Sequence, residues 1–165
     1  MFDPTTFTGF HTWLSLIAIA SGILVVAGLL GGRGKPVTTA LFLFTAILTS
    51  GTGFGFPFNG VLPSHIVGAI ALLVLAVAVI ARYGRHMMGA WRRVYAITAV
   101  ISLYFLVFVA VAQAFQKVPA LRALAPTGAE PPFAIAQVSV LVAFIALGYF
   151  SARRFSRITV RSALA

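Results

Sequence analysis

The sequence predicts an all-α membrane protein, a single domain (residues 1–165) of five transmembrane helices with the N-terminus outside and the C-terminus in the cytoplasm. Hydrophobic residues make up 61% of the chain and charged residues only 8%. A water-soluble protein of this size could not bury so much apolar surface. The basic residues also alternate between the two sides of five long apolar runs, which is the pattern that the positive-inside rule produces.

Five apolar runs are long enough to cross a bilayer as helices. An α-helix rises about 1.5 Å per residue, so about 20 residues cross a hydrocarbon core of roughly 30 Å. The runs cover residues 10–30, 37–58, 63–81, 94–116 and 133–150, and none of them contains Asp, Glu, Lys or Arg. Because lipid offers no hydrogen-bond partner to an exposed backbone, an α-helix is predicted for each run.

Turn and cap residues predict where several of these helices begin and end. Asp3 followed by Pro4 predicts an N-cap and a first helical position ahead of the first run. Residues 31–36, Gly-Gly-Arg-Gly-Lys-Pro, predict its end. Residues 50–60 combine alternating Gly with a Pro, so the second helix is predicted to finish as an irregular, aromatic-rich cap. A short helix is predicted over residues 120–124.

The basic residues set the predicted orientation. With the N-terminus outside, ten of the twelve fall on the cytoplasmic side, whereas Lys117 and Arg122 lie on the opposite side. The ten are Arg33, Lys35, Arg82, Arg85, Arg92, Arg93, Arg153, Arg154, Arg157 and Arg161. A basic residue near an anionic leaflet gains about 1 kcal/mol. Membrane lipids, and not nucleic acid, are therefore the predicted partners of this charge.

Small and polar residues mark the predicted interior faces of the helices. Lipid gives helices no hydrophobic reason to associate, so membrane bundles meet along such residues. The predicted interior positions are His11, Ser15, Ala18 and Gly22 in the first helix; Thr38, Thr45, Thr49 and Thr52 in the second; Thr98, Ser102, Gln113 and Gln116 in the fourth; and Gln137, Gly148 and Ser151 in the fifth. Packing explains most of the hydroxyls, because Ser and Thr in helices commonly bond a carbonyl one turn back.

The larger polar side chains gather in the outer half of the predicted bundle. An unpaired amide or imidazole costs about 1–3 kcal/mol to bury. Their grouping therefore predicts that they bind one another or hold a ligand. The candidate site consists of His11, His65, Gln113 and Gln137, with Phe54, Phe56 and Phe58 as apolar walls.

His11 and His65 are the candidate ligands within this site. Each lies near the N-terminus of its predicted helix, where the helix dipole disfavours the imidazolium and leaves a neutral ring free to bind metal or accept a hydrogen bond. Two such rings at similar depth could hold a haem iron axially. A quinone site and plain hydrogen bonding between helices are the alternatives, and the cofactor is left open.

Few residues suit catalysis. The chain has no Cys, which excludes disulfides and thiolate metal sites. Its two acids are Asp3, predicted to cap a helix, and Glu130, predicted to pair with Arg122 or Lys117. No phosphate loop, zinc-protease helix or nucleophile elbow occurs in the sequence. An enzyme is therefore not predicted.

Five segments carry a resemblance to a known kind of protein. Residues 7–11, 52–58 and 111–121, together with 124–127 and 130–133, are similar to stretches of a family of small bacterial inner-membrane proteins. The resemblance implies a multi-pass protein of the bacterial inner membrane. It brings no activity, cofactor or binding residue.

Three functions are consistent with these observations. The favoured one is an inner-membrane protein that binds a ligand at an outer polar pocket, or that joins a larger complex or homo-oligomer as an accessory subunit. The second is a redox protein that holds haem b or a quinone at the candidate site. The third is a small transporter or channel, although the five runs lack the buried ionisable residues that usually mark ion pathways.

Overall fold

A computed structural model describes residues 3–56 and 63–162, and all of its regular structure in those ranges is helical. The long helices are α1 (Phe7–Leu30), α2 (Pro36–Thr52), α3 (Pro63–Val79), α4 (Trp91–Lys117) and α6 (Pro131–Ser162). The short elements are the 3₁₀ turn η1 (Gly53–Gly55), the π-helical turn η2 (Ile80–Gly84) and α5 (Pro119–Leu124). Within the described residues, five helices are long and apolar enough to cross a membrane, which confirms the predicted all-α fold class with five transmembrane helices, while the predicted orientation stays a prediction.

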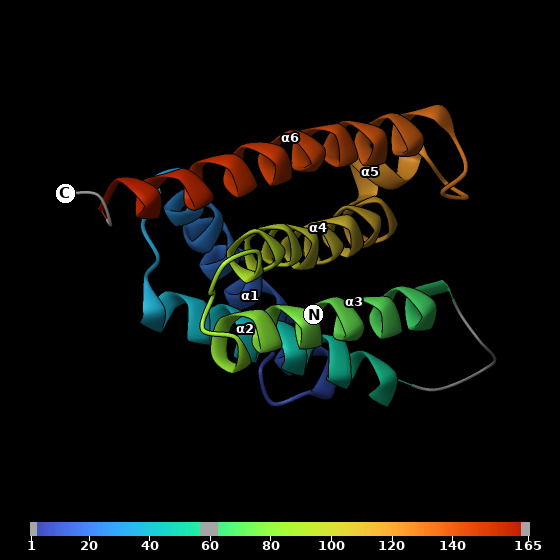
Figure 1. Cartoon of the computed structure of the whole chain (residues 1–165). Helices are drawn as coiled ribbons and strands as arrows, with labels where there is room; N and C mark the ends of the chain where they lie inside the picture. The colour runs from blue at the N-terminus through green and yellow to red at the C-terminus, as the bar shows by residue number, and fades with distance from the viewer. Residues whose placement is uncertain (1–2, 57–62, 163–165) are drawn as a thin grey trace.

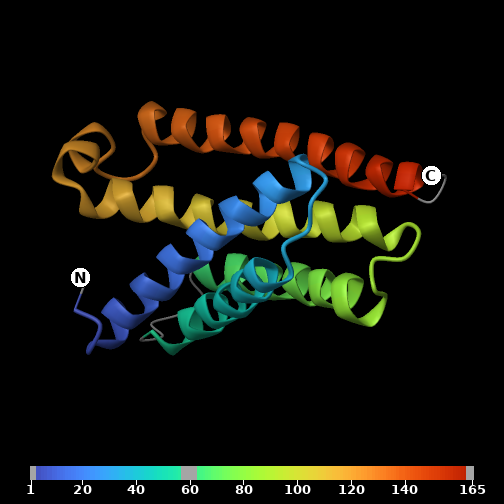
Figure 2. The same cartoon turned by 90° about the vertical axis from the view of Figure 1, so that its left-hand side faces the viewer.

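Helix α4 lies at the centre of the bundle. It packs most extensively against α6 and also contacts α3 and α1, while α1 packs along α2. Figure 1 shows α6 above α4 and α3 below it, and Figure 2 shows α1 crossing the bundle diagonally. The helices therefore do not run as one parallel bundle, since α1 moves away from α4 toward its own N-terminus.

Successive long helices run in opposite directions, so their connections alternate between two ends of the molecule. Figure 2 shows the N-terminal end of α1 and the last turns of α2 at one end, and the C-terminal end of α6 at the other. At that other end a Cβ added to Gly34 would lie 3.8 Å from Arg82 Nη1 and 4.0 Å from Phe155. We call the end that contains His11 and His65 the histidine end, and the end that contains Arg82 the basic end.

The packed core lies between the middle of the bundle and the basic end. All five long helices contribute to it, and its largest fully buried side chains include Tyr95, Phe42 and Leu29. Small residues let the helices approach closely: Ala18, Gly22, Ala46, Ala78, Ala96 and Ala99. The core thus uses the kind of interface that helices need when they associate in lipid.

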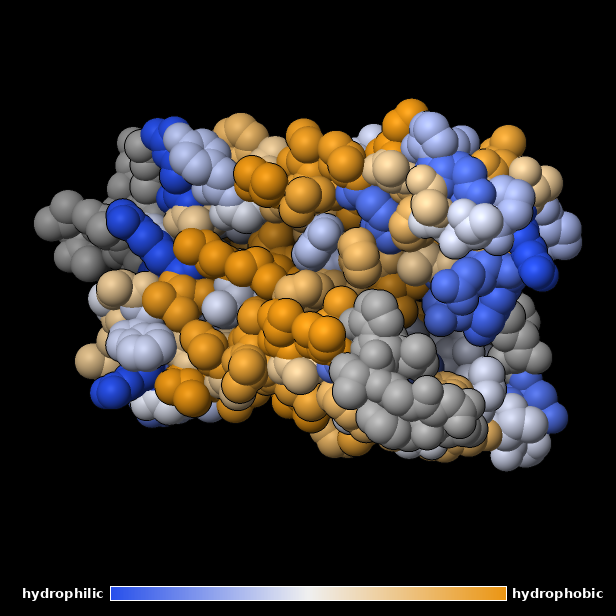
Figure 3. Space-filling model, turned by 90° about the vertical axis from the view of Figure 1, so that its right-hand side faces the viewer, coloured by the Kyte–Doolittle hydropathy of each residue, from blue (hydrophilic) through white to orange (hydrophobic). Residues whose placement is uncertain are grey.

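A broad apolar surface separates the two hydrophilic ends of the molecule (Figure 3). Phe44 is 63% exposed, Leu73 69% and Ile145 63%. In water, an apolar surface of this extent would drive aggregation. In a bilayer the lipid tails cover it, so the surface agrees with five membrane-spanning helices.

Hydroxyl groups inside the helices mostly bond their own backbone, as predicted. The hydroxyls of Ser21, Thr45, Thr98 and Ser102 each donate to the carbonyl four residues earlier, at 2.7 or 2.8 Å. These contacts satisfy polar groups without a partner helix. Most of the small polar stripe therefore has a structural explanation.

The first helix begins later than Asp3 and Pro4 suggest. Thr6 is the N-cap, because its Oγ1 accepts a hydrogen bond from the Gly9 backbone N–H at 3.1 Å. The Asp3 carboxylate instead accepts bonds from the backbone N–H and the hydroxyl of Thr5. The prediction of an Asp3 cap is wrong because the segment turns back over the helix start, and only a glycine at position 9 leaves room for the Asp3 carbonyl.

Other helix ends differ from the predicted ranges at two places. Helix α2 ends at Thr52 and continues as η1, so the predicted second span, residues 37–58, is too long as a regular helix. Helix α6 extends beyond the predicted end at residue 150, to Ser162. The short helix predicted over residues 120–124 is confirmed as α5.

Candidate functional site

Each of the two histidines at the histidine end packs against an aromatic ring. Phe56 contacts His11 edge-on, with ring centroids 5.2 Å apart and an interplanar angle of 88°. Phe54 contacts His65 with centroids 5.7 Å apart. Phe7 of α1 packs on Phe56 at 5.0 Å. We call Phe7, Phe54 and Phe56 the aromatic cap; each histidine packs against a different ring of it.

Glycines allow the aromatic cap to lie this close to the backbone. A Cβ added to Gly55 would lie 2.7 Å from the Phe7 ring, closer than real Cβ contacts. A Cβ at Gly68 of α3 would lie 3.3 Å from the Phe54 ring. Gly55 therefore serves a packing role at the end of α2. The irregular, aromatic-rich end predicted there is confirmed for residues 53–56, while residues 57–60 lie outside the described residues.

A side-chain hydrogen bond holds His11, and the direction of this bond can be inferred. Its Nδ1 lies 2.9 Å from Thr52 Oγ1. The Thr52 hydroxyl has one hydrogen, and its oxygen lies 2.7 Å from the Leu48 carbonyl and 3.2 Å from the Thr49 carbonyl, so that hydrogen is directed to the backbone. His11 Nδ1 is therefore the donor to Thr52. In the neutral ring, Nε2 then carries a lone pair.

The surroundings of His11 leave room for a ligand to reach its ring. The ring is half-buried. The Lys117 ammonium, at the end of α4, lies close enough to interact with it electrostatically. A neutral imidazole lone pair near a cation and aromatic rings can accept a hydrogen bond from a bound molecule.

The two glutamines of the predicted site differ in burial and in their contacts. Gln137 is buried between α6 and α4, where its Nε2 donates to the Phe108 carbonyl at 3.1 Å. Its Oε1 is buried without a partner among the described residues. Gln113 and Gln116 are exposed, so the prediction that they face the interior is wrong. Toward the histidine end α1 diverges from α4 and uncovers that face (Figure 2).

The third predicted wall, Phe58, lies outside the described residues. Phe7 belongs to the aromatic cap and was not predicted. The sequence does carry a signal for it, because Phe7 lies four residues before His11 and therefore on the same face of α1. Within residues 3–56 and 63–162, no three or more His, Cys, Asp or Glu side chains form a group that could hold a metal ion.

Glu130 stabilises the loop before α6 and does not pair as predicted. Its carboxylate accepts hydrogen bonds from the backbone N–H and hydroxyl of Thr127, at 3.1 and 2.9 Å, and from the Ala129 N–H at 3.1 Å. The predicted contact with Arg122 or Lys117 is replaced by these local bonds. Desolvation raises the pKa of Glu130, but the bonds from Thr127 and Ala129 together outweigh it and hold the pKa below its ordinary value of 4.5.

We expect the loop bonds of Glu130 to make stability depend on pH in the acid range. A carboxyl whose pKa is lowered by folding stabilises the protein above its unfolded pKa, and this contribution is lost as the pH falls through the folded pKa. The Tm of the wild type in detergent should therefore fall relative to that of Glu130→Gln as the pH drops below 4.5. Asp3 titrates in both proteins and cancels in this comparison. A Tm difference that is constant with pH would contradict the assignment.

Comparison with known proteins does not indicate a function. No protein-family model, no curated protein and no solved structure matches the chain. The resemblance to small bacterial inner-membrane proteins therefore stays a prediction. The observations that remain are five membrane-capable helices, a histidine end with an oriented imidazole, and a basic end.

Proposed function

We propose that this integral membrane protein binds a small ligand at its histidine end, with His11 as the residue that recognises it. The observation that carries the proposal is the bond between His11 Nδ1 and Thr52, whose own hydrogen is directed to the backbone. It orients a lone pair on Nε2 in a half-buried position. We propose binding rather than turnover, in a multi-pass protein of the bacterial inner membrane or in an accessory subunit of a larger complex there.

The surroundings of His11 suggest the chemistry of the ligand. A hydrogen-bond donor would bind Nε2, an apolar or aromatic body would pack on Phe56, and partial negative charge would be favoured near Lys117. Hydroxylated aromatic molecules that dissolve in membranes, such as quinols, combine these properties. The positive-inside rule supports an outward-facing histidine end, since ten of the twelve basic residues lie in or beside the helix ends at the basic end.

Haem b is the second candidate, because the same lone pair could ligate iron. The geometry favours it less. His11 packs on Phe56 and His65 on Phe54, so each imidazole has its own aromatic neighbour. A Soret band on the purified protein that is lost in both His11→Ala and His65→Ala would establish haem and replace the proposal.

The test uses two threonines of α2 with the same backbone bonding. Thr45 Oγ1 lies 2.7 and 3.2 Å from the carbonyls of Leu41 and Phe42, as Thr52 Oγ1 does from those of Leu48 and Thr49. Only Thr52 binds a histidine. Thr52→Val therefore removes the acceptor for His11, and Thr45→Val is a matched control for the loss of a hydroxyl.

We expect ¹⁵N NMR of the His11 ring to show a protonated Nδ1 in the wild type and in Thr45→Val, and a loss of this preference in Thr52→Val. Binding of a short-chain quinol should weaken about five- to tenfold in Thr52→Val and His11→Ala, the value of one hydrogen bond. Thr45→Val should bind as the wild type does. A wild-type ring protonated on Nε2, or equal binding by all variants, would refute the proposal.

A further inference from the structure

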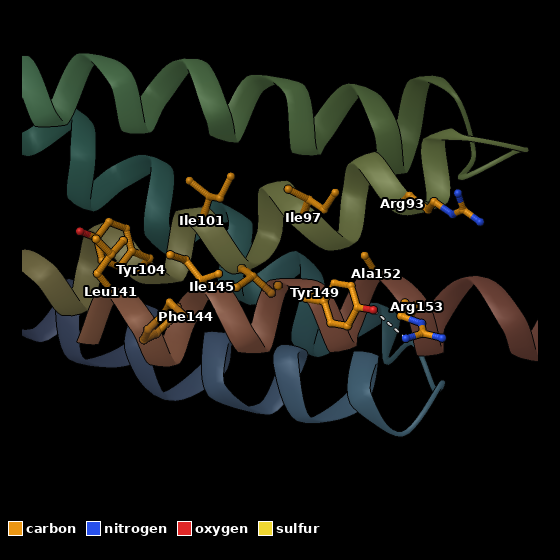
Figure 4. Close-up of a pocket in the computed structure, with 12 residues that line it drawn as sticks. Arg93, Ile97, Ile101, Tyr104, Leu141, Phe144, Ile145, Tyr149, Ala152 and Arg153 are labelled. Atoms are coloured by element: carbon orange, nitrogen blue, oxygen red, sulfur yellow. Dashed lines mark hydrogen bonds between the residues drawn. The ribbon is translucent and has the colours of Figure 1, made fainter. Parts of the chain in front are cut away.

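A groove of about 590 Å³ lies between α4 and α6, in the part of the molecule nearer the basic end. Figure 4 shows apolar side chains along it, among them Ile97 and Ile145, with Tyr104 toward the middle of the bundle. Arg93 and Arg153 lie at its other end. The groove belongs to neither the aromatic cap nor the histidines.

The length of the groove corresponds to one leaflet of a bilayer. From Arg93 to Tyr104 an α-helix rises about 17 Å. Half of a hydrocarbon core of roughly 30 Å is about 15 Å. A groove that begins at the basic residues and ends near the middle of the bundle therefore matches one acyl chain together with its headgroup.

No acidic side chain of this protein lies at the basic end to balance the positive charges there. Arg93 and Arg153 are both exposed. The Arg153 guanidinium lies 5.3 Å from the Tyr149 ring and donates to its hydroxyl at 2.6 Å, which holds the charge at the groove. The chain has only two acidic residues. Asp3 is bound to Thr5, before α1, and Glu130 is bound in the loop before α6, so both belong to the histidine end.

We propose that the groove binds one anionic phospholipid from the leaflet at the basic end. Its phosphate contacts Arg93 and Arg153, and an acyl chain lies along α4 and α6. Guanidinium groups form strong charge-assisted hydrogen bonds with phosphate, which is the anion found at this depth of a membrane. A second copy of the chain fits less well, because two parallel copies that met here would bring like-charged arginines together.

The experiment measures lipid binding to delipidated protein in mild detergent by native mass spectrometry. Phosphatidylglycerol is titrated against phosphatidylcholine, for the wild type and two double variants. Arg93→Gln with Arg153→Gln removes the two groove arginines. Arg33→Gln with Arg154→Gln removes the same charge from exposed positions that do not line the groove.

We expect the wild type to retain one phosphatidylglycerol per chain in preference to phosphatidylcholine. Loss of both groove arginines should weaken its binding about thirtyfold, whereas the control double variant should bind within about twofold of the wild type. Equal weakening in the two double variants would mean general attraction between basic protein and anionic lipid, and would overturn the site. So would equal retention of the two lipids by the wild type.

Two substitutions of Gly148 test the apolar part of the groove without changing charge. A Cβ added to Gly148, which lines the groove, would lie 3.8 Å from Val100 Cγ1, an ordinary contact. Gly148→Ala should therefore fold and bind lipid normally. Gly148→Leu should fill part of the groove and weaken phosphatidylglycerol binding at least about fivefold, with an unchanged Tm in detergent as the folding control. Unchanged binding in a folded Gly148→Leu protein, or cross-linking of two chains through cysteines placed at Ile145, would contradict a lipid in this position.

Discussion

Phe42→Ala is expected to lower the free energy of unfolding by about 2–4 kcal/mol. The Phe42 side chain is 0% exposed and lies in the core cluster of the bundle. In a water-soluble core such a truncation costs about 3–5 kcal/mol. The expected value is somewhat smaller in a membrane, because the unfolded helix also sits in an apolar solvent and the cost is mainly lost packing contacts and a cavity.

Phe44 provides the matched control for this prediction. It lies two residues further along α2 and is 63% exposed on the lipid side. Phe44→Ala should change stability by less than about 0.5 kcal/mol, because lipid replaces the lost contacts. Both variants can be unfolded with SDS in mixed micelles, with helix content followed by circular dichroism. Similar losses for the two variants would mean that α2 presents a different face to the bundle.

The number and approximate limits of the spanning helices could be predicted because they depend on local properties. An apolar stretch of sufficient length specifies a membrane helix by itself. The ends of α1 and α2 depend on tertiary contacts instead. Thr6 caps α1 because the chain before it folds back over Gly9, and α2 ends at Thr52 because the aromatic cap packs beyond it.

The interior faces could be predicted only where neighbouring helices stay close. Thr45, Thr49 and Ser151 are buried as expected, since their small polar side chains lie where helices meet. Gln113 lies on nearly the same face of α4 as the buried Ser102, yet it is exposed. Periodicity gives the angle between two residues, but it does not say where along the helix the neighbour ends.

The residue contacts that form the candidate site could not be predicted from the sequence. His11 and Thr52 were each predicted to face the interior, but their contact depends on how far α1 and α2 are shifted along each other. The α4–α6 groove is harder still, because Ile97 and Ile145 have the composition of any lipid-facing surface. Its shape depends on how two helices pack together. Its proposed role in lipid binding depends on the arginines at its end.

The two ends of the molecule thus carry different kinds of side chain. Imidazole and aromatic groups meet at the histidine end, whereas basic side chains gather at the basic end. If the groove binds lipid and His11 binds a ligand, Thr52→Val should leave phosphatidylglycerol binding unchanged. Loss of the groove arginines should likewise leave the His11 tautomer unchanged, so failure of one proposal does not decide the other.

Gly22→Ala is expected to destabilise the bundle by about 1–3 kcal/mol through overpacking. A Cβ at Gly22 would lie 2.7 Å from Leu103 Cδ1 and 2.7 Å from Phe42 Cε2. Both neighbours are buried, at 2% and 0% exposure, so neither has free space to move into. Gly51→Ala in α2 is the control, because nothing lies within 4 Å of its added Cβ. SDS unfolding should show a loss for Gly22→Ala and little change for Gly51→Ala.

Combining Gly22→Ala with Phe42→Ala distinguishes a steric clash from a general weakness of α1. Truncation of Phe42 opens space beside position 22, and the new methyl group fills part of the cavity. The double variant should therefore lose less stability than the sum of the two single losses, by about 0.5–3 kcal/mol, the usual range for residues in contact. Additive losses would mean that Gly22 and Phe42 do not touch, and that α1 crosses α2 at a different point. Because α1 carries His11 and α2 carries Thr52, this crossing also determines whether the two residues of the proposed site can meet.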